Sequence, residues 1–132
     1  MGDEATEREE LLRRAYAAFN ARDIDAVLAT MWPDVEWPNG MEGGYVYGHE
    51  QVRAYWTRQW GVVNPRVEPL GFTHGGGEVV VEVRHVGRDG SGAVVVEAVV
   101  QHVYRFVAGL VKRMEIRSLG GEPGAAPDTD RR

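Results

Sequence analysis

Apolar residues recur three or four positions apart in three segments of the first half of the chain, which predicts three amphipathic helices. The helices are expected at residues 3–20, from Asp23 to Pro33, and at residues 49–60. Asp23 suits the N-terminal cap of the second helix, and Pro33 ends it because proline cannot continue the hydrogen-bond ladder. Between the second and third helices, residues 35–37 predict a short strand, and the glycine-rich residues 40–48 predict a loop.

From residue 66 onward apolar and polar residues alternate, and β-branched side chains are frequent, so the second half predicts a sheet. Its four strands are expected at residues 67–73, 78–88, 93–106 and 110–118. Pro69 and Gly71 interrupt the first of them, which is therefore expected to be bulged or at an edge.

Alternation places one row of side chains of the third of these strands on a single face. That row is Val94, Val96, Ala98, Val100, His102 and Tyr104. The turn at residues 89–92 suits a two-residue type II′ hairpin with Gly90 at the first central position, where φ is positive. This register pairs His85 with Val96 and puts the row Val79, Val81, Val83 and His85 on the face of His102. Two histidines are expected on one concave, apolar wall, although a slip of one residue would reverse one row.

The order helix, helix, strand, helix and four antiparallel strands predicts one α+β domain over residues 1–119. A strongly curved sheet would close into a cone around a pocket. A flat sandwich without a cavity is the alternative. Residues 120–132 contain glycine, proline and charge, and predict a disordered tail.

Composition narrows the classes of function. The net charge of −5 argues against nucleic acid or an anionic membrane as a partner. The absence of cysteine excludes disulfides and thiol catalysis. Neither a signal peptide nor a membrane-spanning apolar run is recognisable, so the expected location is the cytoplasm.

Four segments together resemble the nuclear-transport-factor-2-like superfamily, and its SnoaL-like polyketide cyclase and ketosteroid isomerase branches most of all. They are residues 11–28, residues 35–38, residues 48–56, and residues 102–106 together with 109–111, and the resemblance extends over about residues 8–119. It implies a cone-shaped curved sheet with three N-terminal helices around a pocket. It also implies a homodimer packed through the outer face of the sheet.

Position by position, the resemblance departs from the isomerase pattern. Trp37 stands where those enzymes have an aspartate base, and His102 where they have a protonated aspartate. Their oxyanion-binding tyrosine matches Ala15, with Tyr16 one place away. Two further tyrosines match Trp32 and Trp56. No base carboxylate remains, so isomerisation by that family mechanism is not expected.

The candidate catalytic residues are His102, His85 and Tyr16, because imidazole can exchange protons near neutral pH. The candidate ligand-binding residues are Trp37, Trp56, Trp32, Tyr55, Val81, Val83, Val100, Tyr104, Met114 and Ile116. No metal or cofactor is expected, because the four histidines lack ligand spacing and no inward carboxylate joins them.

Three functions remain open. The first is a cofactor-independent isomerase, cyclase or dehydratase acting on an apolar polyketide-, terpene- or steroid-like molecule, with His102 as acid and base. The second is a non-catalytic module for ligand binding or dimerisation. The third is a protein-interaction domain.

Overall fold

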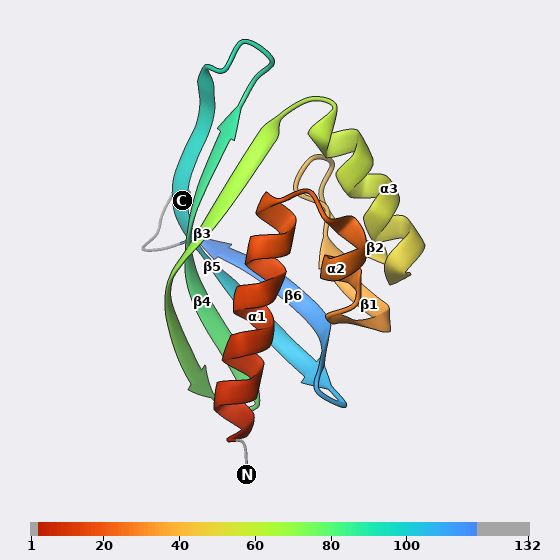
Figure 1. The fold of residues 1–132 in the computed structure, drawn as a ribbon, viewed down its shortest axis with the longest axis vertical. Helices are drawn as coiled ribbons and strands as arrows, with labels where there is room; N and C mark the ends of the chain where they lie inside the picture. The colour runs from red at the N-terminus through yellow and green to blue at the C-terminus, as the bar shows by residue number, and fades with distance from the viewer. Residues whose placement is uncertain (1–2, 119–132) are drawn as a thin grey trace.

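The helices lie over one face of a curved, six-stranded sheet, which Figure 1 shows from the side of α1. This structure, a computed structural model, describes residues 3–118, and the predicted tail at 120–132 lies outside the described residues. The helices are α1 (Glu4–Asn20), α2 (Ile24–Leu28) and α3 (Gly48–Trp60). The strands are β1 (Met31–Pro38), β2 (Tyr45–Tyr47), β3 (Asn64–Gly75), β4 (Glu78–Arg88), β5 (Val94–Val107) and β6 (Leu110–Ser118). The predicted α+β class is confirmed.

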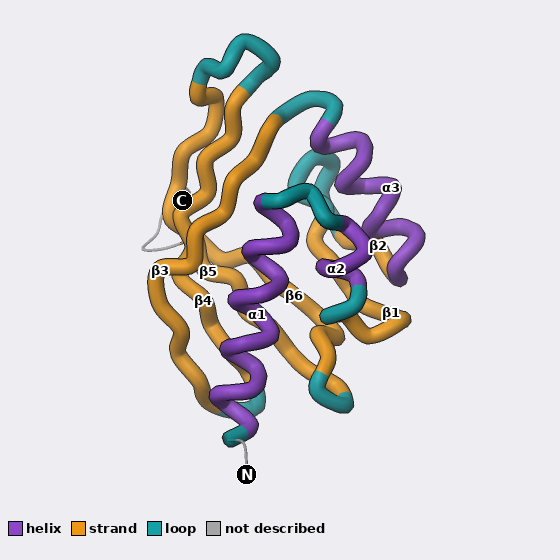
Figure 2. The backbone as a smooth tube through the Cα atoms, in the orientation of Figure 1, coloured by secondary structure: helices purple, strands orange, loops and turns teal. Residues whose placement is uncertain are grey.

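The sheet has the strand order β2-β1-β6-β5-β4-β3, so its two ends do not meet (Figure 2). The long strands β3 to β6 pair antiparallel, as predicted. β1 instead runs parallel to β6, so the sheet is mixed and not purely antiparallel. This pairing joins the helical half of the chain to its last described strand.

The second helix is shorter than predicted. Asp23 caps it as expected, with its carboxylate accepting from the Ala26 N–H at 3.1 Å, but α2 ends at Leu28. The Thr30 hydroxyl donates to the Val27 carbonyl, and the Thr30 carbonyl accepts from Val111 of β6. The chain is therefore extended from Met31 onward, although the prediction continued the helix to Pro33.

Pro33 lies inside β1 because the pairing with β6 is irregular there. The β1–β6 register shifts between Met31 and Glu36, and a bulge of this kind does not need the N–H that proline lacks. The prediction from the sequence pattern was wrong at this point because β6, the strand that pairs with β1, comes from the other end of the chain.

The β4–β5 hairpin differs from its prediction in turn type and register. His85 pairs with Ala98 and not with Val96, a shift of two residues. The left-handed residue is Gly92, with φ of 89°, and not Gly90. The Gly92 N–H donates to the Asp89 carbonyl, as in a type I turn that is followed by a left-handed glycine. An even shift leaves every side chain on its predicted face, so His85 and His102 still share one face.

A bulge near the tip of this hairpin interrupts the predicted inward row. The register changes between Gly87 and Arg88, and Val94 pairs with Arg88. The alternation predicted from Val94 to Tyr104 is therefore regular only from Val96 onward.

β3 is an edge strand with a bulge between Pro69 and Gly71, as predicted. Asn20, at the end of α1, pairs with this edge: its side-chain amide donates to the Val67 carbonyl at 2.7 Å and accepts from the Val67 N–H at 2.9 Å. One side chain thus replaces a neighbouring strand at this position.

The core lies between the concave face of the sheet and the apolar faces of α1 and α3. The side chains that are completely excluded from solvent there are Leu12, Val35, Val52, Val79, Val81 and Val83. Next to these residues, between α1, α3 and the sheet, the packing leaves a cavity.

Candidate functional site

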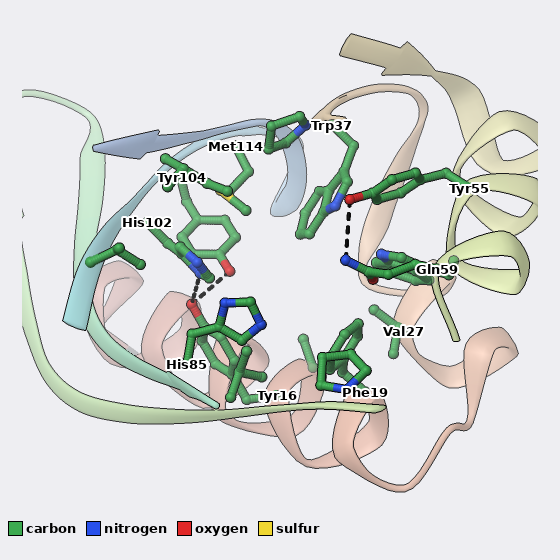
Figure 3. Close-up of a pocket in the computed structure, with 17 residues that line it drawn as sticks. Tyr16, Phe19, Val27, Trp37, Tyr55, Gln59, His85, His102, Tyr104 and Met114 are labelled. Carbon is green, nitrogen blue, oxygen red and sulfur yellow. Dashed lines mark hydrogen bonds between the residues drawn. The ribbon is translucent and has the colours of Figure 1, made fainter. Parts of the chain in front are cut away.

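A cavity of about 150 Å³ lies on the concave side of the sheet, between α1 and α3 (Figure 3). Its wall is mainly aromatic and aliphatic, and residues 3–118 contribute no aspartate, glutamate, lysine or arginine to it. Ile116 of β6 is part of the wall and is 46% exposed, so the cavity opens to solvent beside this strand.

Three buried side chains form a hydrogen-bonded chain at one side of the cavity. The Tyr104 hydroxyl donates to the Tyr16 hydroxyl at 2.7 Å, and Tyr16 contacts Nδ1 of His102 at 2.8 Å (Figure 3). Tyr104 and His102 are two residues apart on β5 and therefore point to the same side, whereas Tyr16 approaches from α1. All three are less than 10% exposed.

His102 is held as a neutral imidazole. Burial, with a smaller contribution from the neighbouring His85, lowers the pKa of His102 from 6.5 to about 3. Because Tyr16 receives the proton of Tyr104, its own proton goes to Nδ1 of His102, and the ring proton of His102 is therefore on Nε2.

Nε2 of His102 is free to meet a ligand. Within residues 3–118 it has no hydrogen-bond partner, and it is not completely excluded from solvent. Since His102 lines the cavity, Nε2–H is a donor available to a molecule inside it. The same burial keeps the tyrosine hydroxyls protonated, because it raises the pKa of both Tyr16 and Tyr104.

His85 brings a second imidazole to the same wall. It lies on β4, is half-buried and lines the cavity, and desolvation lowers its pKa from 6.5. Neither of its ring nitrogens has a hydrogen-bond partner among the described residues, so a neutral His85 has one unprotonated nitrogen that no other side chain engages.

Aromatic rings enclose the middle of the cavity. The Trp56 ring centroid is 5.5 Å from that of Trp37 and 5.4 Å from that of Phe19, both in edge-to-face contact. Trp37 also lies 6.5 Å from Tyr104. These contacts fix the rings in place, so the apolar walls are formed before a ligand enters.

A second polar group lies on α3, across the cavity from His102 (Figure 3). The Gln59 side chain donates to the Tyr55 hydroxyl at 3.2 Å, and this hydroxyl also accepts from the Gly40 N–H at 3.0 Å. Both residues line the cavity, one turn apart on the helix.

Most of the predicted site residues line this one cavity. They are His102, His85, Tyr16, Trp37, Trp56, Tyr55, Val100, Tyr104, Met114 and Ile116. Three predicted residues do not line it: Val81 and Val83 are buried in the core, and Trp32 lies elsewhere on β1. Val81 and Val83 are on the predicted face, but the packing around them leaves no cavity.

Several lining residues were not predicted, namely Ala15, Phe19, Val27, Pro38, Gln59, Pro65 and Val67. Phe19 belongs to the same helical stripe as Tyr16, and Gln59 follows Tyr55 at a spacing of four, so both signals were present in the sequence. Pro65 and Val67 join the wall through the curvature of β3, which a sequence pattern does not give.

The resemblance-based alignment placed Ala15 at the tyrosine position, one residue from Tyr16. In the structure both residues line the cavity, and it is the Tyr16 hydroxyl that reaches His102.

Two other kinds of site have no counterpart in the described part of the chain. Within residues 3–118, no three histidine, aspartate or glutamate side chains gather as a set of metal ligands. No helix in that part of the chain has the length and apolar character that crossing a membrane requires.

Known proteins share this architecture. The structure of TerC co-crystallized with polyporic acid is 30% identical over 83% of this chain and 89% of TerC, with a TM-score of 0.75. An NTF2-like protein of unknown function from Burkholderia pseudomallei is 29% identical over 85% of this chain and 90% of its own, also with a TM-score of 0.75. A Mycobacterium tuberculosis protein in complex with estradiol-17beta-hemisuccinate is 20% identical over 82% of this chain and 90% of its own, with a TM-score of 0.70.

No curated protein matches the sequence. The SnoaL-like domain, however, matches residues 12–114, which include part of α1, all of α2 and α3, strands β1 to β5 and the first part of β6. The chain therefore belongs to the SnoaL-like domain family and has the NTF2-like fold.

Proposed function

We propose that the cavity binds a small, neutral, largely apolar ring compound whose acceptor oxygen, such as a carbonyl, meets Nε2–H of His102. The single observation that carries this proposal is the buried, neutral His102, which Tyr16 holds by Nδ1 in a largely apolar cavity. A donor that is already oriented loses little freedom when it binds a ligand.

Size and charge support a small neutral ligand. A cavity of 150 Å³ is about what one aromatic ring fills, and a larger ligand would extend through the opening beside Ile116. An ionised ligand would find no opposite charge in the wall, and burying an unpaired charge is strongly unfavourable. TerC, 30% identical to this chain, was crystallised with an organic molecule, polyporic acid.

Acetophenone is a suitable first probe, because it combines one ring with one carbonyl. Trp37 and Trp56 line the cavity, so we expect its binding to quench tryptophan fluorescence in a saturable way. His102→Phe should weaken binding about tenfold, as expected for the loss of one hydrogen bond. His74→Phe is the matched control, since His74 lies on β3 outside the cavity and contacts Glu9. A titration without saturation would contradict the proposal.

Catalysis is a second candidate function, and His85 is the observation that favours it. A ligand carbonyl held by His102 would place neighbouring C–H groups in a cavity that His85 also lines. His85 would remove a proton from the carbon next to the carbonyl, and the electron pair would move to the oxygen that His102 holds. Where the ligand has a C=C bond next to that carbon, the electron pair also extends to the far carbon of this bond, and return of the proton there shifts the double bond and completes an isomerisation that needs no cofactor.

Deuterium exchange separates the enzyme from the binding module. In D₂O, the methyl protons of bound acetophenone should exchange faster than in buffer, and proton NMR measures the rate. His85→Phe should lower the protein-dependent rate about 100-fold, while the affinity for acetophenone should stay near that of the wild type. An exchange rate that the protein does not change, together with saturable binding, would leave the non-catalytic function.

We also propose that two chains pair through the outer face of the sheet. On this face Val99 is 42% exposed and is flanked by the ion pair between Arg84 and Glu97. Val99→Glu should convert a dimer to a monomer in light scattering. Val96→Glu is the control, because Val96 is equally exposed but lies on the other face, opposite Gly87. A wild-type protein that scatters as a monomer would contradict the pairing.

A further inference from the structure

We propose that Gln59 recognises a second polar group of the ligand, so that the ligand has an acceptor oxygen at its His102 end and a hydroxyl or another donor at its Gln59 end. This inference rests on the proposed ligand-binding function. It assigns to Gln59 the role of a specificity-determining residue.

Gln59 is the one side-chain amide in the cavity wall formed by the described residues. It comes from α3, whereas His102 and Tyr104 come from β5 and Tyr16 from α1. Figure 3 shows Gln59 and Tyr55 on the side of the cavity away from these three residues and from His85. The cavity therefore has two polar ends with aromatic rings between them.

The orientation of the Gln59 amide follows from its neighbours. Tyr55 lies in the helix wall, and its hydroxyl accepts from the Gly40 N–H and from Nε2 of Gln59. With Nε2 engaged in this way, the Oε1 atom of Gln59 has no partner among residues 3–118. Oε1 of Gln59 is thus an acceptor without a partner on a residue that lines the cavity, while His102 presents a donor.

These opposite polarities define the ligand class. A molecule with a carbonyl at one end and a hydroxyl at the other pairs with both residues, and its apolar ring lies against Trp37 and Trp56. A molecule without the hydroxyl displaces water from Oε1 of Gln59 and gives this atom no hydrogen bond in return. The free-energy cost of this unpaired acceptor is the source of the selectivity for ligands that carry the hydroxyl.

Four single-ring probes test each end separately: 4′-hydroxyacetophenone, 4′-methoxyacetophenone, acetophenone and ethylbenzene. For the wild type we expect 4′-hydroxyacetophenone to bind about tenfold tighter than acetophenone, and acetophenone about tenfold tighter than ethylbenzene. The methoxy compound offers only an acceptor, so it should bind no tighter than acetophenone. Dissociation constants are measured by calorimetry and tryptophan fluorescence.

Gln59→Met keeps the length of the side chain and removes its acceptor. In this variant the preference for the hydroxyl should disappear, while the preference for the carbonyl should remain. Gln51→Met is the matched control: it is the same exchange on the same helix, at an exposed residue that contacts the Tyr47 N–H and lies outside the cavity. It should keep both preferences.

Each outcome has a separate meaning. If no probe binds, the proposed function is wrong and this inference fails with it. If the probes bind but the hydroxyl brings no gain, only the role of Gln59 is overturned. A methoxy compound that binds as tightly as the hydroxyl compound, or a hydroxyl preference that persists in Gln59→Met, overturns it as well. The wild-type probe series alone decides the donor preference if the variant does not fold.

Discussion

At the scale of single residues, Tyr16 is the centre of the polar side of the cavity. Its hydroxyl accepts from Tyr104 and donates to His102, so it connects a residue of α1 to two residues of β5. This arrangement fixes the tautomer of His102. The direction in which the imidazole can donate is therefore set by a tyrosine that comes from another element.

Removing the Tyr16 hydroxyl should lower the stability more than removing the Tyr104 hydroxyl, which lies at one end of the hydrogen-bonded series. Tyr16→Phe leaves Nδ1 of His102 and the Tyr104 hydroxyl without partners in a buried site, which should lower the free energy of unfolding by about 2–4 kcal/mol. Tyr104→Phe leaves the contact between Tyr16 and His102 intact and should cost about 1 kcal/mol. Urea unfolding of the three proteins measures both values. Equal losses would contradict the central place of Tyr16.

The pH dependence of stability should report the burial of His102. The pKa is near 6.5 in the unfolded chain and about 3 in the folded protein. Between these two values the unfolded state binds the proton and the native state does not, so the free energy of unfolding falls as the pH drops. The contribution is at most about 1.4 kcal/mol per pH unit.

His102→Asn keeps an acceptor near the position of Nδ1 but does not titrate. Denaturant unfolding between pH 7 and 4 should therefore give a flatter profile for this variant than for the wild type. The carboxylates with lowered pKa, such as Glu9 and Asp89, are present in both proteins and cancel in the comparison. Parallel profiles would show that His102 binds its proton equally well in the folded and the unfolded chain, and so would contradict the lowered pKa.

The sequence predicts these residues unequally well. Alternation along β4 and β5 predicts that His85, His102 and Tyr104 share a face, because every second side chain of a strand points to the same face of the sheet. It predicts the cavity less well. Val81 and Val83 lie on the same face but are covered by neighbouring side chains. Only the three-dimensional packing determines which residues of this face are covered and which line the cavity.

At the scale of elements, turn geometry determines how the hairpins form. Ala108 and Gly109 connect β5 to β6 with positive φ at both positions, 52° and 81°. These are the dihedral signs of a type I′ turn, which asparagine followed by glycine adopts most easily. Ala108→Asn should therefore raise the free energy of unfolding by about 0.5–1 kcal/mol. Thermal unfolding monitored by circular dichroism measures it, and a lower midpoint would contradict the turn type.

The β4–β5 turn offers a matched pair of glycines. Gly92 has φ of 89°, whereas Gly90 has an ordinary negative φ, and a Cβ at either position would meet no other atom within 4 Å. Gly92→Ala should cost about 1–2 kcal/mol from backbone strain alone. Gly90→Ala should change stability by less than about 0.5 kcal/mol. The type II′ turn that the sequence suggests would reverse this order, so the two variants decide between the turns.

The same scale explains the error at α2 and β1. Residues 24–31 carry apolar residues at helical spacing, and Pro33 is an ordinary helix end. The structure ends α2 earlier because β6, about eighty positions away in the sequence, pairs with the chain from Met31 onward. Local periodicity contains no information about such a partner.

At the scale of the whole molecule, the cavity depends on elements from both halves of the chain. α1 and α3 provide Tyr16, Phe19, Tyr55 and Gln59, and the strands provide the histidines and Met114. The order of elements predicts this architecture, since helices that precede a curved sheet must cover one of its faces. The chemical character of the ligand depends on finer geometry, namely which nitrogen of His102 faces Tyr16 and which atom of Gln59 faces Tyr55.

The parallel contact between β1 and β6 also has a consequence for how the protein is made. β6 is the last strand described, and it separates β1 from β5 in the sheet. While a ribosome is still synthesising residues 110–118, β1 and β5 each lack one of their two neighbouring strands, and Met114 and Ile116 are missing from the cavity wall. Closing so long a loop is slow compared with forming a local helix. A nascent chain that stalls before Leu110 should consequently expose apolar surface to chaperones and lack a complete cavity for a ligand, whereas the addition of β6 joins the two parts of the sheet and completes the site.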